Sequence, residues 1–296
     1  MGNYNTNYDY ENTFFIGMDV HKNTISLITY HLPTNKYSFE STIPTDYKLI
    51  LSYIENLDNY TGNCATFVCG YEAGCLGFAL QRKLETHGVK CIILAPTTMH
   101  VDRTRVKTDK RDARVIAHCL ATNGYKPVHI PTLQDEQIKN LLRMIDDHKV
   151  MLKKVKQQIL SFCLKNGYEY SGKGHWNNAH LKWLKELQPS GLDEFTLTSY
   201  LTTYYTICGY IDSFINKIEE LAKLPDYKES VEKLSCFLGI KTYTAMSIIV
   251  EVSDFSRFEN ARNFSAYLGL CPGYNVFKSV KHLSKEYTKN TFTLSS

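Results

Sequence analysis

The sequence lacks paired cysteines, long apolar runs and an apolar N-terminal segment. Nine cysteines are scattered along 296 residues, and none forms a C-x-x-C pair. An odd number of unclustered cysteines argues against both a disulfide framework and a zinc site, and indicates a reducing compartment. No apolar run approaches the ~20 residues of a membrane-spanning helix, and the polar start over residues 1–10 does not resemble a signal peptide. We therefore expect a cytoplasmic protein that makes no contact with membranes.

A strong charge of one sign is also missing. The formal net charge is +4 and the pI is about 8.4, which is weaker than the pI above roughly 9 of a dedicated nucleic-acid-binding domain. Basic residues can still be concentrated locally in a chain with a small net charge. The apolar content of 43% is ordinary for a globular protein, and 296 residues exceed the usual size of one domain. Twenty-one tyrosines supply rings for packing or for stacking on bases.

The first 130 residues alternate short apolar strands with helices, after a leader over residues 1–13 that we expect to be disordered. The hydrophobic patterns predict strands at 14–20, 24–32, 36–42, 65–70 and 89–95. They predict helices at 45–57, 76–87 and 109–122. Short turns join the first three strands, and helices connect the later ones, so the sheet is expected to be mixed. This α/β order resembles the ribonuclease-H-like arrangement and defines a predicted domain over residues 14–130.

The rest of the chain is predicted to be mainly helical. Residues 133–166 are typical of one long amphipathic helix, and 196–224 of a second. We expect the pair to form a helical arm over residues 131–226, with a plain helical hairpin as the alternative. A third unit is expected from residue 227 to 296. Within it, residues 234–258 resemble a helix-hairpin-helix that grips duplex DNA, or else a simple αα-hairpin.

Acidic residues stand at the ends of the elements around the predicted sheet. Asp19 ends the first strand, Glu72 follows a later buried strand, and Asp109 and Asp112 share one face at the start of a helix. Strand ends and a following helix can bring such carboxylates together, and their mutual repulsion is relieved by divalent cations. Two Mg²⁺ ions roughly 3.5–4 Å apart can assist the displacement at a phosphodiester. Alternatively, Asp109 and Asp112 complement the helix dipole after Thr108, and Glu72 is a simple loop charge.

Basic side chains precede and accompany the last two acids. They are Arg103, Arg105, Lys107, Lys110, Arg111 and Arg114. A phosphate backbone brought to a metal site needs such neutralising charge, so these residues are predicted to bind nucleic acid. The alternative is a solvated helix face. The same two interpretations hold for a second basic stretch, which comprises Lys149, Lys153, Lys154 and Lys156.

Three motifs give the sequence a family resemblance. Ile-Gly-Met-Asp-Val-His-Lys begins at residue 16, Tyr-Glu-Ala-Gly at residue 71, and Arg-Val-Lys-Thr-Asp-Lys-Arg-Asp-Ala-Arg at residue 105. Over residues 14–276 the chain resembles the DEDD transposases of the IS110 family of insertion sequences. The resemblance implies a resolvase-like site on Asp19, Glu72, Asp109 and Asp112 that holds two Mg²⁺ ions, or Mn²⁺. It also implies cleavage and rejoining of DNA at element ends and target, by an oligomer that a structured RNA guides.

The resemblance ends where the family carries a serine nucleophile, usually followed by glycine. By spacing, that position falls near Phe277, and Ser279 is only a weak candidate that requires an insertion in the loop. Residues 290–296 lack amphipathic periodicity and resemble a truncated or frameshifted reading. A catalytically incomplete nucleic-acid-binding remnant of a transposase is therefore the alternative. An actin-like phosphotransferase is disfavoured, since its Gly-rich phosphate loops are missing from the sequence.

Overall fold

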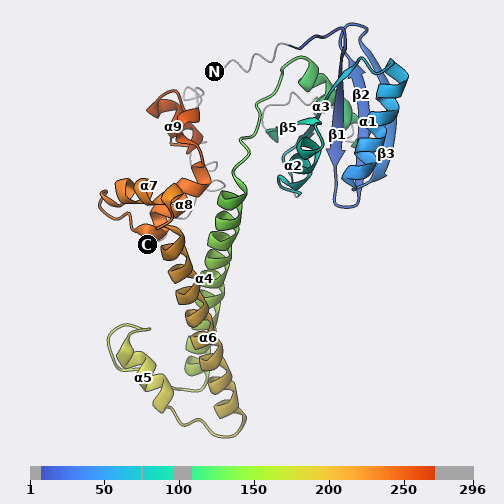
Figure 1. Ribbon diagram of the computed structural model, residues 1–296. Helices are drawn as coiled ribbons and strands as arrows, with labels where there is room; N and C mark the ends of the chain where they lie inside the picture. The colour runs from blue at the N-terminus through green and yellow to red at the C-terminus, as the bar shows by residue number, and fades with distance from the viewer. Residues whose placement is uncertain (1–7, 75, 97–108, 271–296) are drawn as a thin grey trace, which may run out of the picture. The chain divides into compact units, whose positions relative to one another are not determined.

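The computed structural model describes residues 8–74, 76–96 and 109–270 (Figure 1), with only the backbone of Asp109 and Lys110. The chain divides into two compact units, Met1–Ile130 and Pro131–Ser296.

The first unit is built on a five-stranded mixed sheet. Its strands are β1 (Thr13–Val20), β2 (Thr24–His31), β3 (Lys36–Pro44), β4 (Thr66–Glu72) and β5 (Lys90–Leu94). Their order across the sheet is β3-β2-β1-β4-β5. β1 pairs antiparallel with β2, and β2 with β3, whereas β1 pairs parallel with β4, and β4 with β5. Short turns force the antiparallel pairs and helical crossovers produce the parallel ones. The predicted ribonuclease-H-like mixed sheet is confirmed.

Helices cover both faces of this sheet. They are α1 (Tyr47–Thr61), α2 (Ala79–Thr86) and α3 (Asp109–Ala121). Because side chains alternate along a strand, Ile16 and Met18 of β1 enter one core with α1 and α2. Phe15 points to the other face, where it packs with α3. Tyr8 and Tyr10, which we expected in a disordered leader, pack against Phe15 with ring centroids 5.4 and 6.1 Å from it.

Gly17 lets α3 lie directly on the middle of β1. A Cβ atom at this position would overlap the Ala113 carbonyl oxygen and would lie 2.5 Å from the Ala117 amide nitrogen. Both contacts are with backbone, which cannot move away as a flexible side chain can. The glycine therefore sets how closely the first turns of α3 approach the strand.

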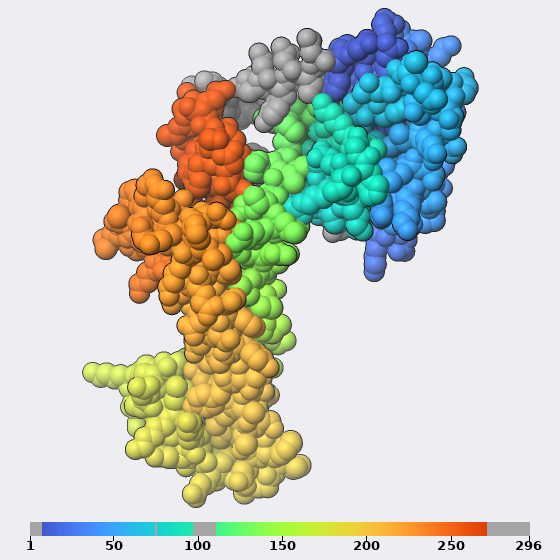
Figure 2. Space-filling view, viewed as in Figure 1, coloured from blue at the N-terminus to red at the C-terminus, as the bar shows by residue number. Residues whose placement is uncertain are grey.

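The second unit is helical. α4 (Leu133–Lys165) and α6 (Leu192–Leu221) pack along each other (Figure 1). Between them in sequence lies α5 (Asn178–Glu186), in a segment outside the two predicted helices. In Figure 2 this segment forms a lobe beside the end of the helix pair. α5 is nine residues long, too short to show a helical period, and it begins where the Asn177 side chain accepts a hydrogen bond from the His180 amide.

The C-terminal helices share a core with this pair. They are α7 (Pro225–Ser235), α8 (Thr242–Val252), the 3₁₀ turn η2 (Phe255–Arg257) and α9 (Ala261–Tyr267). Ile138 of α4 and Ile218 of α6 are buried in one cluster with Val231 of α7 and Met246 of α8. The buried cluster therefore extends across residue 227, where a separate unit was predicted to begin. The exposed apolar sides of α4 and α6 need cover, and α7 and α8 supply it.

Within the described part of the chain, no helix combines the length and the apolar character needed to cross a membrane.

Candidate functional site

Two of the predicted acids lie at the same end of neighbouring strands. Gly17 of β1 is paired with Gly70 of β4, and Met18 with Tyr71. The same offset, carried one residue further, puts Asp19 level with Glu72. By strand alternation both acids share the face of Gly17 and Gly70. That face is the one covered by α3, since a Cβ at Gly70 would lie 2.8 Å from the Leu120 side chain.

The start of α3 points toward this strand end. His118, in the second half of α3, lies 5.7 Å from the Tyr30 ring, and Tyr30 is the β2 partner of Phe15. Ala113, in the first half, contacts the strand at Gly17. α3 therefore runs antiparallel to β1, and its N-terminus lies toward the end of the strand that carries Asp19. Its half-buried Asp112 belongs to the turn at that end.

Three of the four predicted acids are therefore placed at one edge of the sheet by backbone register and helix direction. They are Asp19, Glu72 and Asp112. The fourth, Asp109, is the first residue of α3, and its side chain lies outside the described part of the structure. One helical turn separates it from Asp112, so the two share a face of the helix.

Asp19 is the best defined of these residues. Its side chain is 15% exposed, and its Oδ2 lies 3.1 Å from Nε2 of His21, which is 52% exposed. The His21 backbone is fixed at the end of the strand: its amide donates to the Thr24 carbonyl at 2.9 Å, and the Thr45 hydroxyl donates to its carbonyl at 2.8 Å. His21 was not among the predicted site residues. The strand pattern does not predict this contact, because His21 lies one residue beyond the end of β1.

The chemistry of these side chains fits a hard divalent cation. Carboxylate oxygens are the ligands that Mg²⁺ and Mn²⁺ take, and a largely covered carboxylate such as Asp19 is stabilised by nearby positive charge. Among the described side chains, no three His, Cys, Asp or Glu groups lie close enough together to hold a metal by themselves. The fit therefore rests on donor type and on the shared strand edge.

The predicted basic surface is described only in part. Arg111 and Arg114 are exposed on α3. The Arg114 guanidinium is 2.7 Å from the Glu40 carboxylate and lies over the Tyr37 ring at 5.4 Å, so it is tied to β3. The side chains of Arg103, Arg105, Lys107 and Lys110 lie outside the described residues. Phe277 and Ser279 also lie outside the described residues.

The second basic stretch lies on α4 and is partly engaged in contacts within its own unit. Lys149 is 3.1 Å from the Asp146 carboxylate, and its ammonium lies over the Tyr243 ring at 4.0 Å. The Lys156 ammonium lies over the Trp176 ring at 5.3 Å. For Lys149 and Lys156 a packing role is therefore visible, while nucleic-acid contact stays a prediction.

The predicted hairpin is present between α7 and α8. α8 begins at Thr242, with no side-chain hydrogen bond at its N-cap, and Gly239 has a φ of 89° in the connecting turn. Leu238 in this turn is fully exposed. This geometry is that of two helices joined by a tight, glycine-containing turn. It suits either of the two interpretations, a duplex grip or a plain helical hairpin.

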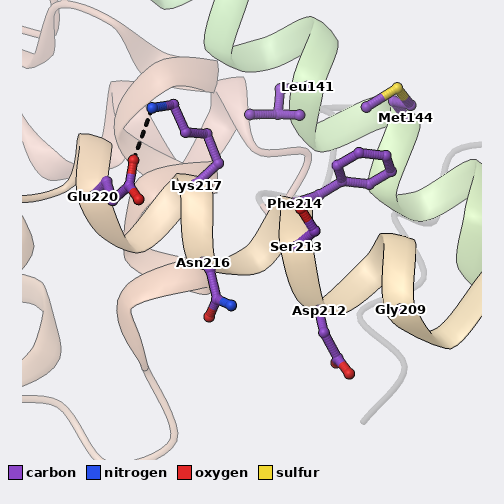
Figure 3. Close-up of a pocket in the computed structure, with 9 residues that line it drawn as sticks. All are labelled: Leu141, Met144, Gly209, Asp212, Ser213, Phe214, Asn216, Lys217 and Glu220. Atoms are coloured by element: carbon purple, nitrogen blue, oxygen red, sulfur yellow. Dashed lines mark hydrogen bonds and ion pairs between the residues drawn. The ribbon is translucent and has the colours of Figure 1, made fainter.

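A surface hollow lies elsewhere, along α4 and α6 (Figure 3). It has a volume of about 630 Å³. Leu141 and Met144 line it from α4, and the rest comes from α6, where Lys217 pairs with Glu220 at 2.7 Å. It contains none of the predicted acids. In Figure 3 the Phe214 ring points toward Met144, while Asp212 points away from α4.

A ribonuclease-H-like sheet with acids at one strand edge defines a class of DNA-processing nucleases and recombinases. Within that class, comparison with known families is decisive. A profile of DEDD transposases of the IS110 type, described as "Transposase", matches residues 16–167. A second, described as "Transposase IS116/IS110/IS902 family", matches residues 231–284, beyond residue 276 where the sequence motifs ended. The chain belongs to the IS110 family of transposases.

Individual proteins give the same result. The transposase for insertion sequence element IS1533 of Leptospira borgpetersenii is 29% identical over 281 residues, which are 93% of this chain and 80% of that protein. A protein of Sinorhizobium fredii described as a transposase, y4qE, is 31% identical over 205 residues, 69% of this chain and 49% of that protein. Among solved structures, T. thermophilus RuvC in complex with a Holliday junction substrate matches 39% of this chain and 99% of that chain, at 9% identity and a TM-score of 0.28. The fold class rests on the strand order and not on this last match.

Proposed function

We propose that this chain cleaves and rejoins DNA strands during the transposition of an insertion sequence. One observation carries the proposal: the register that pairs Gly17 with Gly70 puts Asp19 level with Glu72, on the face covered by α3. Membership of a transposase family supplies the reaction class.

In this proposal Asp19, Glu72, Asp109 and Asp112 hold divalent cations, Mg²⁺ or Mn²⁺. When bound, a pair of such ions stabilises both the attacking and the leaving oxygen of a phosphodiester displacement. The chain's own part is to keep several carboxylates together at one strand edge, with Asp19 largely covered. The close packing of α3 against Gly17 fixes the position of Asp112 relative to β1.

The proposed partners are DNA at the element ends and the target, and an element-encoded guide RNA. Arg111 is exposed in the turn that carries Asp112 and supplies positive charge for a phosphate backbone. RNA guidance and an oligomeric assembly follow from the family resemblance alone. Footprinting of the chain on RNA and on DNA, with its mass in solution, would examine these two points.

The central test is cleavage of a branched or element-end DNA with Mg²⁺. Asp19→Asn is expected to lower the rate by about a thousandfold, since the cation contribution amounts to several kcal/mol. Glu55→Gln is the matched control: this carboxylate is exposed on α1, which covers the opposite face of the sheet. Equal rates for Asp19→Asn and the unaltered chain would refute the proposed site.

The same assay separates the alternative, a nucleic-acid-binding remnant without activity. The observation that favours it is Phe277 at the position where the family carries serine. A remnant would bind DNA with equal affinity in the unaltered and Asp19→Asn chains, and neither would cleave. If cleavage occurs, Ser279→Ala shows whether rejoining depends on that hydroxyl.

A further inference from the structure

We propose that His21 is a positioning residue, which fixes the Asp19 carboxylate for cation binding. The proposal rests on the proposed function of the acidic edge and names a residue that the four-acid site does not include. The imidazole Nε2 lies 3.1 Å from Asp19 Oδ2, within hydrogen-bond distance.

Local structure fixes where the imidazole can go. Asp19 is the penultimate residue of β1, and His21 directly follows the strand, so the imidazole has to reach back only two residues to the carboxylate. The His21 backbone is tied on both sides, through its amide to Thr24 and through its carbonyl to Thr45. Thr45 precedes α1, so three segments of the chain meet at this histidine. The ring is therefore presented to the carboxylate by a backbone with little freedom.

The two side chains differ in their exposure to solvent. Asp19 is 15% exposed and His21 is 52% exposed, so the imidazole lies on the solvent side of a mostly covered carboxylate. An imidazole that donates from Nε2 holds the carboxylate in one orientation. Groups that orient metal-binding carboxylates in this way commonly contribute 10- to 100-fold to metal affinity.

A direct role as a metal ligand is the competing role for the same ring. Two ligand atoms of one ion also lie about 3 Å apart, given bond lengths near 2.1 Å at right angles. We favour positioning because the remaining predicted donors are all carboxylates, which suit Mg²⁺, whereas imidazole suits softer ions. The two roles differ in one respect: positioning needs only a hydrogen-bond donor at the place of Nε2.

The test compares two amides that differ in reach. In His21→Gln the side-chain amide can occupy the place of Nε2, and in His21→Asn it is too short to do so. Thermal unfolding of the full chain, titrated with MnCl₂ or MgCl₂ alone, gives an apparent Kd for the cation without any nuclease assay. The cation concentration at half-maximal cleavage is a second readout. His87→Ala is the control, since His87 ends α2 on the opposite face of the sheet.

We expect His21→Asn to raise the apparent Kd by about 10- to 100-fold, and His21→Gln to stay within about threefold of the unaltered chain. Cleavage by His21→Asn should recover at saturating cation. Equal Kd values for His21→Asn and the unaltered chain would overturn the proposal, and so would an equal loss in both variants, which would make the imidazole itself a ligand. If Asp19→Asn leaves the cation titration unchanged, the acidic site fails, whatever His21 does.

Discussion

Gly17 is a residue at which the fold tolerates little change. An alanine Cβ there would meet two backbone atoms of α3, one in Ala113 and one in Ala117. Overpacking of this kind costs about 3 kcal/mol when the neighbours cannot move. We expect Gly17→Ala to lower the free energy of unfolding by that amount, measured by urea denaturation followed by circular dichroism. Asp112 would move with α3, so cleavage should fall as well.

Gly209→Ala is the matched control for this substitution. Gly209 lies inside α6, and a Cβ there would have no atom within 4 Å. Alanine in a helix interior is more stable than glycine by about 0.5–1 kcal/mol. A loss of stability in Gly209→Ala similar to that in Gly17→Ala would show that close packing on β1 is not the cause.

Asp135 is a second residue with a defined energetic role. Its side chain is buried, and it accepts hydrogen bonds from the Tyr227 and Ser253 hydroxyls, both at 2.7 Å. Burial and the neighbouring carboxylate raise the pKa of Tyr227, so the phenol stays protonated and donates. Tyr227→Phe leaves a buried carboxylate with one donor fewer and should cost about 1–3 kcal/mol in urea denaturation.

Tyr243→Phe provides the comparison for Tyr227→Phe. The Tyr243 hydroxyl also donates to a carboxylate, that of Asp146 at 2.9 Å, but the Asp146 side chain is 65% exposed. Water can replace the lost hydroxyl there, so the expected cost is about 0.5 kcal/mol or less. Equal costs for the two substitutions would contradict a special role for the buried Asp135.

At the scale of elements, α5 depends on a buried histidine. His180 is fully buried; its Nδ1 accepts from the Trp176 amide at 3.2 Å, and its Nε2 has no hydrogen-bond partner among the described atoms. Burial, with a smaller contribution from His175, lowers the pKa of His180 below its ordinary 6.5. The folded lobe thus binds the proton less well than the unfolded chain does. Its stability is full above about pH 6.5 and declines as the pH falls toward the lower folded-state pKa.

Tryptophan fluorescence can follow this decline directly. The chain has two tryptophans, and the rings of Trp176 and Trp183 lie 5.2 and 5.6 Å from the His180 ring. We expect the emission to shift to longer wavelength below pH 6.5, with a midpoint that moves lower in more stable conditions. His180→Phe keeps a ring in the core and should remove the pH dependence. An unchanged titration in that variant would assign the effect to another group.

The helices and strands of the structure show which elements a sequence pattern can predict. The strands and long helices were predicted within a few residues because an alternating or helical apolar pattern persists over each of them. α5 was missed, since nine residues carry too little pattern and its first turn depends on the Asn177 cap. In the site, Asp19 and Glu72 follow from strand ends in the sequence. His21 does not, because the hydrogen bond to Asp19 depends on the turn that Thr24 and Thr45 fix.

At the scale of the whole molecule, the predicted boundary between residues 130 and 131 coincides with the division between the two units, whereas the shared core of the helices beyond it was not predicted. The sequence of each amphipathic helix predicts an apolar side, but it does not predict which other helix packs against that side. No single segment of the sequence therefore predicts the core that contains Ile138, Ile218 and Met246. It follows that residues 131–270 should unfold as one body, and not as an arm and a separate C-terminal unit.

Cation binding provides a test of this two-unit organisation. All predicted ligands lie in the first unit, whereas Trp176 and Trp183 lie in the second. A ligand at 100 times its Kd stabilises the state that binds it by about 2.7 kcal/mol. In scanning calorimetry we expect Mg²⁺ to raise the midpoint of one transition, while the transition seen by tryptophan fluorescence stays in place. Asp19→Asn should abolish the shift. If the fluorescence midpoint rose with the calorimetric one, the two units would unfold together or the cation would bind the helical unit.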